Sequence, residues 1–283
     1  MELYIGVLGE GMNDVEVAAL VDTTRGELRD RIAQALARFD RLARTADPLA
    51  QLPGSSWTAQ QAVAHVLTIV QRYLRLRQGD SRLADQPREL NVINQSELEA
   101  AMAPIPKLAD QIQALAPELD ALFDIIADEG PVLPFHCGAH VDGNTWQTNW
   151  LGELLMHGRD IARAAKVTWE LPERDMLLIA RGLMQIAPAY VLNTIPPNTD
   201  ICVAIDVPEA RPYLIHIHNG IAELRVRRPS DRPHAVLRVP ASTLTQLLYQ
   251  RIGQFTAARL GLRVVGGRRP WLALKLVSCF EAP

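Results

Sequence analysis

The hydrophobic periodicity of this chain changes at Leu171-Pro172, and this change limits the folds that the chain can adopt. Before it, apolar residues recur with the 3.6-residue period of helices, and after it short alternating segments typical of strands follow one another. The 283 residues are enough for two domains of ordinary size. We therefore expect one domain at residues 1–168 and a smaller one at 172–283.

The first domain is predicted to consist of helices. They cover Asp14–Thr45, Thr58–Gln78, Val92–Glu129 (broken near Pro104 and Pro106) and Asn144–Lys166, with a short extended or hairpin loop at Pro131–Gly143. Thr58, followed three residues later by Gln61, forms a capping-box pattern that marks the start of the second helix. Four helices with one long irregular connection favour a four-helix bundle.

The second domain is predicted to be an α+β fold with a mainly antiparallel sheet. Its expected elements are a helix at Arg174–Leu192, strands at Ile201–Val207, Tyr213–His218, Ile221–Arg228 and Ala235–Val239, helices at Ala241–Arg251 and Gln254–Leu260, and the closing segments Leu262–Val265 and Trp271–Cys279. Asn219-Gly220 lies between two alternating segments, which is the strongest short-range signal for a β-hairpin.

Charge is distributed unevenly between the two halves. Residues 1–170 carry 15 Lys and Arg against 24 Asp and Glu, a net charge of −9, whereas residues 171–283 carry 14 against 8, a net charge of +6. This distribution argues against a uniformly basic nucleic-acid-binding protein. It fits two modules of opposite charge that face each other across a cleft.

Targeting and redox features favour a cytoplasmic protein without a membrane partner. Met1-Glu2-Leu3-Tyr4 lacks the basic region of a secretory signal. The longest uncharged stretches, Gln51–Gln71 and Gly182–Thr199, contain many polar residues and prolines, so neither is expected to span a bilayer. The three cysteines are odd in number and far apart, which fits a reducing compartment.

Glu153 and His157 are four residues apart in the last predicted helix, so their side chains share one face. Trp146 and Trp150 lie on the same stripe, which is expected to point into the bundle. A carboxylate on an apolar stripe is costly to desolvate unless it is paired or coordinated. For this pair alone, an internal Glu–His hydrogen bond or a position at the boundary of the core is the more common explanation, since such spacings are frequent on helices.

His65 adds a third candidate ligand residue to this pair. It lies two turns into the second predicted helix, and bundle sites are built from inward side chains on facing helices. Two histidines and one glutamate suit zinc with a fourth position left open, which is the arrangement of catalytic zinc sites. We therefore predict a divalent metal ion, Zn²⁺ in the first instance, at His65, Glu153 and His157.

These residues resemble a known family. Trp57-Thr58 followed by His65, and then Glu153-Leu154-Leu155-Met156-His157-Gly158-Arg159-Asp160, are similar to motifs of the mycothiol-dependent maleylpyruvate isomerases, which belong to the DinB-like metal-binding bundles. The second half, residues 172–283, is similar to the sterol-carrier-protein-like α+β domain of these isomerases, especially from His234 through Phe280. The resemblance implies His65, Glu153 and His157 as metal ligands and mycothiol as cosubstrate. Only three of the 29 basic residues are lysine, a bias of GC-rich genomes that fits this actinobacterial thiol.

The chemistry that the resemblance implies begins with a thiol deprotonated by the metal. The thiolate would add to a conjugated cis double bond, and rotation and elimination would complete an isomerisation; alkylation of the thiolate would instead be an S-transferase reaction. An anionic substrate of the maleylpyruvate type requires a nearby cation. Arg225, Arg227 or Arg228 of the basic second domain could supply it, although arginines on strands are usually only solvated.

Other candidates remain open at this point. His136, Cys137 and His140 form a rival cluster in the loop before the last helix of the bundle, but no second cysteine pair completes a structural zinc site. His216 and His218 share one strand face and are expected to face solvent, and His234 has no visible partner. The alternative functions are a non-catalytic metal- or lipid-binding or regulatory protein and a thiol-independent metal hydrolase.

Overall fold

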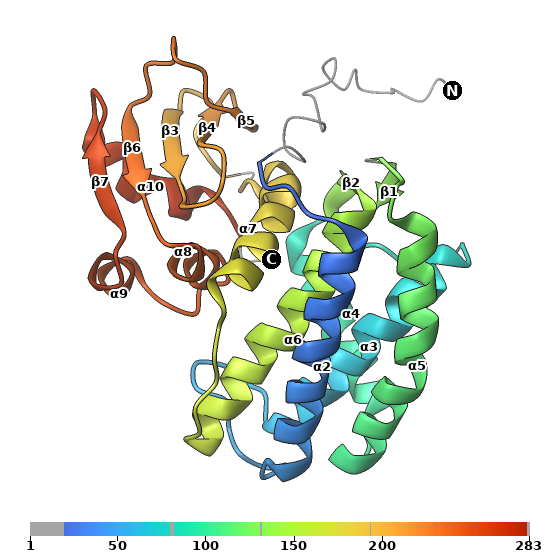
Figure 1. Cartoon of the computed structure of the whole chain (residues 1–283). Coiled ribbons are helices and arrows are strands. Elements are labelled where there is room, and N and C mark those ends of the chain that lie inside the picture. Colours follow the sequence, from blue (N-terminus) through green and yellow to red (C-terminus); the bar gives the residue numbers. More distant parts are fainter. Residues whose placement is uncertain (1–19, 80–81, 131, 193, 282–283) are drawn as a thin grey trace.

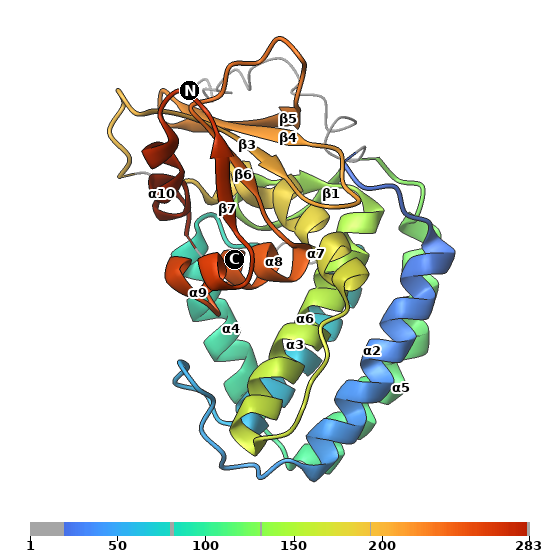
Figure 2. The same cartoon turned by 60° about the vertical axis from the view of Figure 1, so that its left-hand side comes forward.

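The computed structural model describes residues 20–79, 82–130, 132–192 and 194–281, and its elements follow the expected order (Figure 1). The first half contains α2 (Arg25–Thr45), α3 (Ala59–Arg77), α4 (Pro87–Ala101), α5 (Ile105–Ile126) and α6 (Gly143–Ala165). Helices α2 and α3 each pack against both α5 and α6, which makes a four-helix bundle, and α4 lies outside it against α3 (Figure 2). The predicted bundle is confirmed.

The first and third helices differ from the prediction in their bounds. Helix α2 begins at Arg25 rather than at Asp14, because Thr24 caps it by accepting a hydrogen bond from the Glu27 N–H at 3.1 Å. Residues 14–19 lie outside the described residues. The third stretch forms two helices, and α4 begins at Pro87, since proline is favoured in the first helical turn.

Two local predictions in the first half are confirmed. The capping box at the start of α3 is complete: Thr58 Oγ1 accepts from the Gln61 N–H at 3.4 Å, and Gln61 Oε1 accepts from the Thr58 N–H at 2.8 Å. Before α6, β1 (Leu133–Pro134) and β2 (His140–Val141) pair as a small antiparallel hairpin. The chain thus enters α6 from a turn, where the Asp142 side chain accepts from the Thr145 N–H at 2.7 Å.

The first residue of α6 packs directly against the last residue of α5. A Cβ placed on Gly143 would lie 1.8 Å from the Ile126 carbonyl oxygen and 2.6 Å from its carbonyl carbon. Only glycine allows the two backbones to approach this closely. The contact brings the start of α6 against the end of α5.

We expect Gly143→Ala to lower the free energy of unfolding by about 1–3 kcal/mol, the usual cost of overpacking, because backbone atoms must move apart. Urea unfolding followed by circular dichroism measures this change. Gly130→Ala is the matched control, since a Cβ on Gly130 would meet no atom of the described residues within 4 Å. Equal unfolding free energies of the two variants would contradict the prediction.

The second half begins with α7 (Glu173–Ile186) and a short 3₁₀ turn (Ala187–Tyr190). The remaining elements are β3 (Asp200–Asp206), β4 (Tyr213–His218), β5 (Ile221–Val226), β6 (Ala235–Arg238), α8 (Ala241–Leu248), α9 (Gln254–Arg259), β7 (Arg263–Gly266) and α10 (Ala273–Leu276). The strand order is β5-β4-β3-β6-β7, and only the β3–β6 pair is parallel. The predicted α+β fold with a mainly antiparallel sheet is confirmed.

Helix α7 connects the two halves physically, because it packs against α6 on one side and α8 on the other (Figures 1 and 2). Its Arg181 guanidinium reaches Asp142 at the start of α6, with Nη2 2.5 Å from Oδ2.

Among the described residues, none of the helices combines the length and the apolar run that crossing a bilayer would need.

Candidate metal centre

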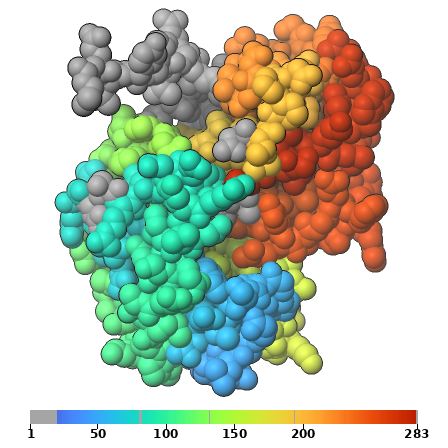
Figure 3. Space-filling view, turned by 180° about the vertical axis from the view of Figure 1, so that it is seen from behind, coloured from blue at the N-terminus to red at the C-terminus, as the bar shows by residue number. Residues whose placement is uncertain are grey.

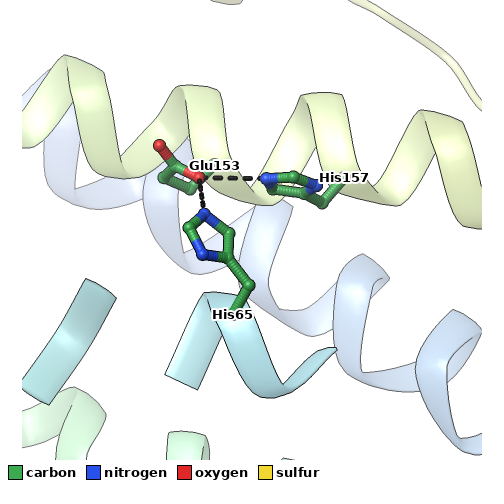
Figure 4. A group of neighbouring side chains, drawn as sticks. All are labelled: His65, Glu153 and His157. Carbon is green, nitrogen blue, oxygen red and sulfur yellow. Dashed lines mark ion pairs between the residues drawn. The ribbon is translucent and has the colours of Figure 1, made fainter. Parts of the chain in front are cut away.

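The three predicted ligand residues meet at the interface of α3 and α6 (Figure 4). His65 projects from α3, and Glu153 and His157 project from consecutive turns of α6. Glu153 Oε2 lies 3.4 Å from His65 Nε2 and 3.2 Å from His157 Nε2. Both imidazoles therefore direct the same type of nitrogen at one carboxylate oxygen.

These separations fit a tetrahedral zinc site. With metal–ligand distances of about 2.0–2.1 Å, neighbouring ligand atoms of a tetrahedron lie about 3.3 Å apart. Nε2–Oε2 separations of 3.2 and 3.4 Å match this value. His65 and His157 are also largely buried, at 3% and 8% exposure, so an ion between them would be held away from bulk water.

Burial and hydrogen bonding favour the protonation states that a metal requires. Burial lowers the pKa of His65, which opposes its protonation, although the hydrogen bond to Glu153 acts in the other direction. Burial alone would raise the pKa of Glu153, but hydrogen bonds from His157 and His65 outweigh it and the pKa of Glu153 is lowered. His65 therefore presents a neutral imidazole and Glu153 an ionised carboxylate, the ligand forms that bind metal.

The Nδ1 atoms of His65 and His157 are buried and have no hydrogen-bond partner among the described residues. Metal-bound histidines usually donate their second N–H to a carboxylate, a carbonyl or water. Here the two imidazole rings are held by packing against Trp57 instead. The centroid of the Trp57 ring lies 4.9 Å from that of the His65 ring and 6.0 Å from that of the His157 ring. Trp57 is held in turn by donating from Nε1 to Gln95 Oε1 of α4 at 3.1 Å.

Gly158, next to His157, has a packing role. A Cβ at this position would lie 2.3 Å from Cζ2 of Trp169. Trp169 donates from Nε1 to the Leu155 carbonyl at 3.0 Å, and the Arg38 guanidinium lies 4.5 Å from its ring centroid. The glycine thus lets Trp169 pack on the back of the ligand-bearing helix.

The three residues line a cavity of about 430 Å³ between the bundle and the second half of the chain. Its walls come from α3, α4, α6, the loop before α3, the β1–β2 hairpin that contains His136, and the segments that contain Tyr190, Tyr249 and Arg251. Figure 3 shows where the blue loop, the teal α4 and the orange-red C-terminal segments meet around this hollow. The volume is within the range of sites for small molecules.

Two hydrogen-bond donors face each other in this cavity. Arg72 is fixed by Glu97 (Nη2–Oε2 2.6 Å) and Asn94 (Nη2–Oδ1 2.7 Å), and its Nη1 lies 3.4 Å from His136 Nε2. His136 Nδ1 accepts from the Ala84 N–H at 3.0 Å, so the hydrogen of the neutral ring is on Nε2. Neither nitrogen can accept from the other, whereas an anionic oxygen placed beside both could accept from each of them.

The neutral state of His136 follows from its surroundings. Burial and the charge of Arg72 lower the pKa of His136 to about 3. Sequence reasoning treated His136 as part of a rival metal cluster and missed Arg72 as a site residue. The local signal available was the position of Arg72, seven residues after His65 and so on the same face of α3.

The arginines expected to face the cavity lie elsewhere. Arg225 is on β5, where it forms an ion pair with Asp231 (Nη2–Oδ1 2.7 Å), and neither Arg225 nor Arg227 is among the described residues that line the cavity. The second half instead contributes Arg251, whose Nε donates to Asp160 Oδ2 at 2.8 Å. Arg251 follows α8, so the turn after that helix, rather than a strand, delivers the cation.

The rival cluster in the β1–β2 hairpin is not assembled. Among the described residues, the groups that could hold an ion are His65, Glu153 and His157, and a second group on the sheet, without His136, Cys137 or His140. Burial raises the pKa of the Cys137 thiol to about 11, so it is not a thiolate at neutral pH.

Comparisons with known proteins give one family model and several solved structures that are similar to this chain. Residues 15–162 match the family model of the mycothiol maleylpyruvate isomerase N-terminal domain. The solved mycothiol-dependent maleylpyruvate isomerase is 12% identical, with a TM-score of 0.50 over 87% of this chain and 97% of that chain. A sec-alkylsulfatase from Pseudomonas sp. is 11% identical, with a TM-score of 0.32 over 62% of this chain and 30% of that chain. No curated protein sequence matches the chain.

Proposed function

Because the chain belongs to the family defined by the mycothiol maleylpyruvate isomerase N-terminal domain, we propose that it is a metal- and thiol-dependent enzyme. Its substrate would be a small electrophile that carries a carboxylate, and its cosubstrate mycothiol. The reaction would be an isomerisation or an S-transfer. The observation that carries this proposal is the meeting of His65 Nε2, Glu153 Oε2 and His157 Nε2 at the wall of a cavity.

The ligand set explains why a thiol would react here. A divalent ion held by His65, Glu153 and His157 would stabilise a bound thiol as the thiolate, the nucleophilic form of sulfur, at neutral pH. In the isomerisation, addition of the thiolate would turn the double bond of an activated alkene into a single bond. After rotation about that bond, elimination of the thiolate would restore the double bond. The thiol is regenerated, so no oxidant or reductant is consumed. In an S-transfer the substrate would remain on the sulfur.

The residues of the chain have two tasks in this reaction. His136 Nε2–H and Arg72 Nη1–H would donate to a carboxylate oxygen of the substrate and so orient its reacting carbon. Trp57, whose ring is tilted against that of His65 with the centroids 4.9 Å apart, would shield a bound thiolate from water. Arg251, held by Asp160, adds positive charge on the wall contributed by the second half.

The function is tested with purified protein, zinc, mycothiol and maleylpyruvate. We expect conversion of the substrate only when both zinc and mycothiol are present. Turnover of esters or amides without any thiol would instead indicate a metal hydrolase. Absence of turnover of any thiol adduct, together with a copurified lipid, would indicate a binding protein.

A prediction concerns the anion-binding donors. We expect Arg72→Met to raise KM for a carboxylate-bearing substrate by at least about tenfold, because a charge-assisted hydrogen bond of about 1.5–3 kcal/mol is lost. Zinc content should not change, since Arg72 is not a ligand. Arg75→Met is the matched control, because Arg75 pairs with the same Glu97 (Nη2–Oε1 2.7 Å) but does not line the cavity. An equal rise of KM in both variants would show that the effect comes from breaking the ion pairs of Glu97 and not from losing an anion-binding donor.

A further inference from the structure

A second group of ligand-type side chains lies on the sheet, outside the cavity. It consists of His216, His218 and Glu223, whose ligand atoms lie within 4.8 Å of one another. His216 and His218 are two residues apart on β4, so they share one face of the sheet. Glu223 of β5 is directly opposite His216 in the antiparallel register, which puts its carboxylate on that same face.

A fourth residue, Asp200 of β3, supports this group from the other side. It is the register partner of His218, and its Oδ1 accepts from His216 Nε2 at 2.8 Å. This hydrogen bond lowers the pKa of Asp200, so the carboxyl group is ionised. It also leaves the Nδ1 lone pair of His216 available to an ion. A carboxylate that holds one nitrogen of a histidine is the usual outer-shell arrangement at metal sites.

The two histidine rings pack against each other, and Glu223 lies next to them. Their centroids lie 4.4 Å apart, and His218 Nε2 lies 3.0 Å from Glu223 Oε1. The side chains of His216 and His218 are 32% and 27% exposed, which leaves them accessible to ions from solution. Imidazole nitrogens next to a carboxylate form a donor set for a divalent ion.

We propose that His216, His218 and Glu223 bind a divalent transition-metal ion and that Asp200 orients His216. Imidazole and carboxylate donors suit Zn²⁺, Ni²⁺ and Cu²⁺. The ion would link β4 to β5 directly and to β3 through Asp200. This proposal does not depend on the proposed function, because none of the four residues lines the cavity.

Calorimetric titration of the full chain with Zn²⁺ alone tests the proposal. We expect the wild type to bind two equivalents, His216→Gln/His218→Gln to retain only the bundle ion, and Glu153→Gln to retain only the sheet ion. Asp200→Asn should weaken binding at the sheet by about 10–100-fold, as the loss of an outer-shell partner does. Glu223→Gln should also remove the sheet ion, which checks the site without altering a histidine.

The control is His140→Gln, which removes an exposed histidine outside the group and should leave both equivalents. Two outcomes would overturn the proposal. In the first, the His216→Gln/His218→Gln variant binds as much Zn²⁺ as the wild type. In the second, the wild type binds a single equivalent of Zn²⁺, and Glu153→Gln binds none. Catalytic turnover serves as a separate readout. Its loss in Glu153→Gln and its retention in His216→Gln/His218→Gln would keep the two sites, and the two proposals, distinguishable.

Discussion

Replacing Glu153 with glutamine is expected to abolish zinc binding at the bundle and to reduce thiol-dependent turnover by about 10³-fold or more. The amide is a neutral and poor metal ligand, and it leaves only His65 and His157 at the site. A bound metal stabilises the charge of a transition state by several kcal/mol, and each 1.36 kcal/mol of activation free energy corresponds to a factor of about ten in rate. Zinc content by elemental analysis and turnover with mycothiol measure the two effects.

The variant should be compared in the His216→Gln/His218→Gln background, so that an ion on the sheet does not contribute to the zinc content. Glu118→Gln is the matched control, because it removes the same charge from an exposed position of α5. Full zinc occupancy in Glu153→Gln would contradict the assignment of this carboxylate as a ligand. Full occupancy with lost turnover would separate metal binding from catalysis.

The second large effect is expected at the contact between α7 and the start of α6. Arg181→Ala should lower the free energy of unfolding by about 3–5 kcal/mol, because it leaves the buried Asp142 carboxylate without its counter-charge. Both residues are buried, and Arg181 Nη1 also lies 3.1 Å from Asp142 Oδ1 and from Thr145 Oγ1. Urea unfolding followed by circular dichroism measures the loss.

Two further variants show which part of this loss is electrostatic. Asp142→Asn/Arg181→Met removes both charges and retains a side chain that can cap α6, so it should recover most of the lost stability. Arg44→Ala breaks pairs with Asp40 and Asp110 at the surface and should cost less than about 1 kcal/mol. A single Arg181→Ala variant as stable as Arg44→Ala would contradict the prediction.

Local patterns predicted much of the fold. The capping box at Thr58, the hairpin at Asn219-Gly220 and the shared face of Glu153 and His157 all depend on residues within four positions of one another. The bounds of helices were less predictable where caps or tertiary contacts decide them. The helix expected from Asp14 contains α2, which begins only after its cap Thr24, and the apolar periodicity did not indicate a boundary at Thr24.

The sheet cluster shows a signal that sequence reasoning could have used. A two-residue turn at Asn219-Gly220 pairs His218 with Ile221 and therefore His216 with Glu223. The hairpin register alone thus predicts one of the contacts. The position of Asp200 depends on the pairing of β3 with β4 across a longer connection. The partner of His234 depends on the parallel pairing of β3 with β6, which brings the Cys202 N–H to 3.1 Å from the accepting His234 Nδ1.

The order of residues by itself determined which side chains could serve as ligands and which helix faces they occupy, since helical and strand periods are properties of a few adjacent residues. Only the tertiary structure decided that α3 and α6 are neighbours, that Arg72 and His136 direct their donors at one point, and that Arg251 rather than Arg225 reaches the cavity. These contacts join segments far apart in the chain. They are selected by the packing of whole helices and strands, which no local pattern specifies.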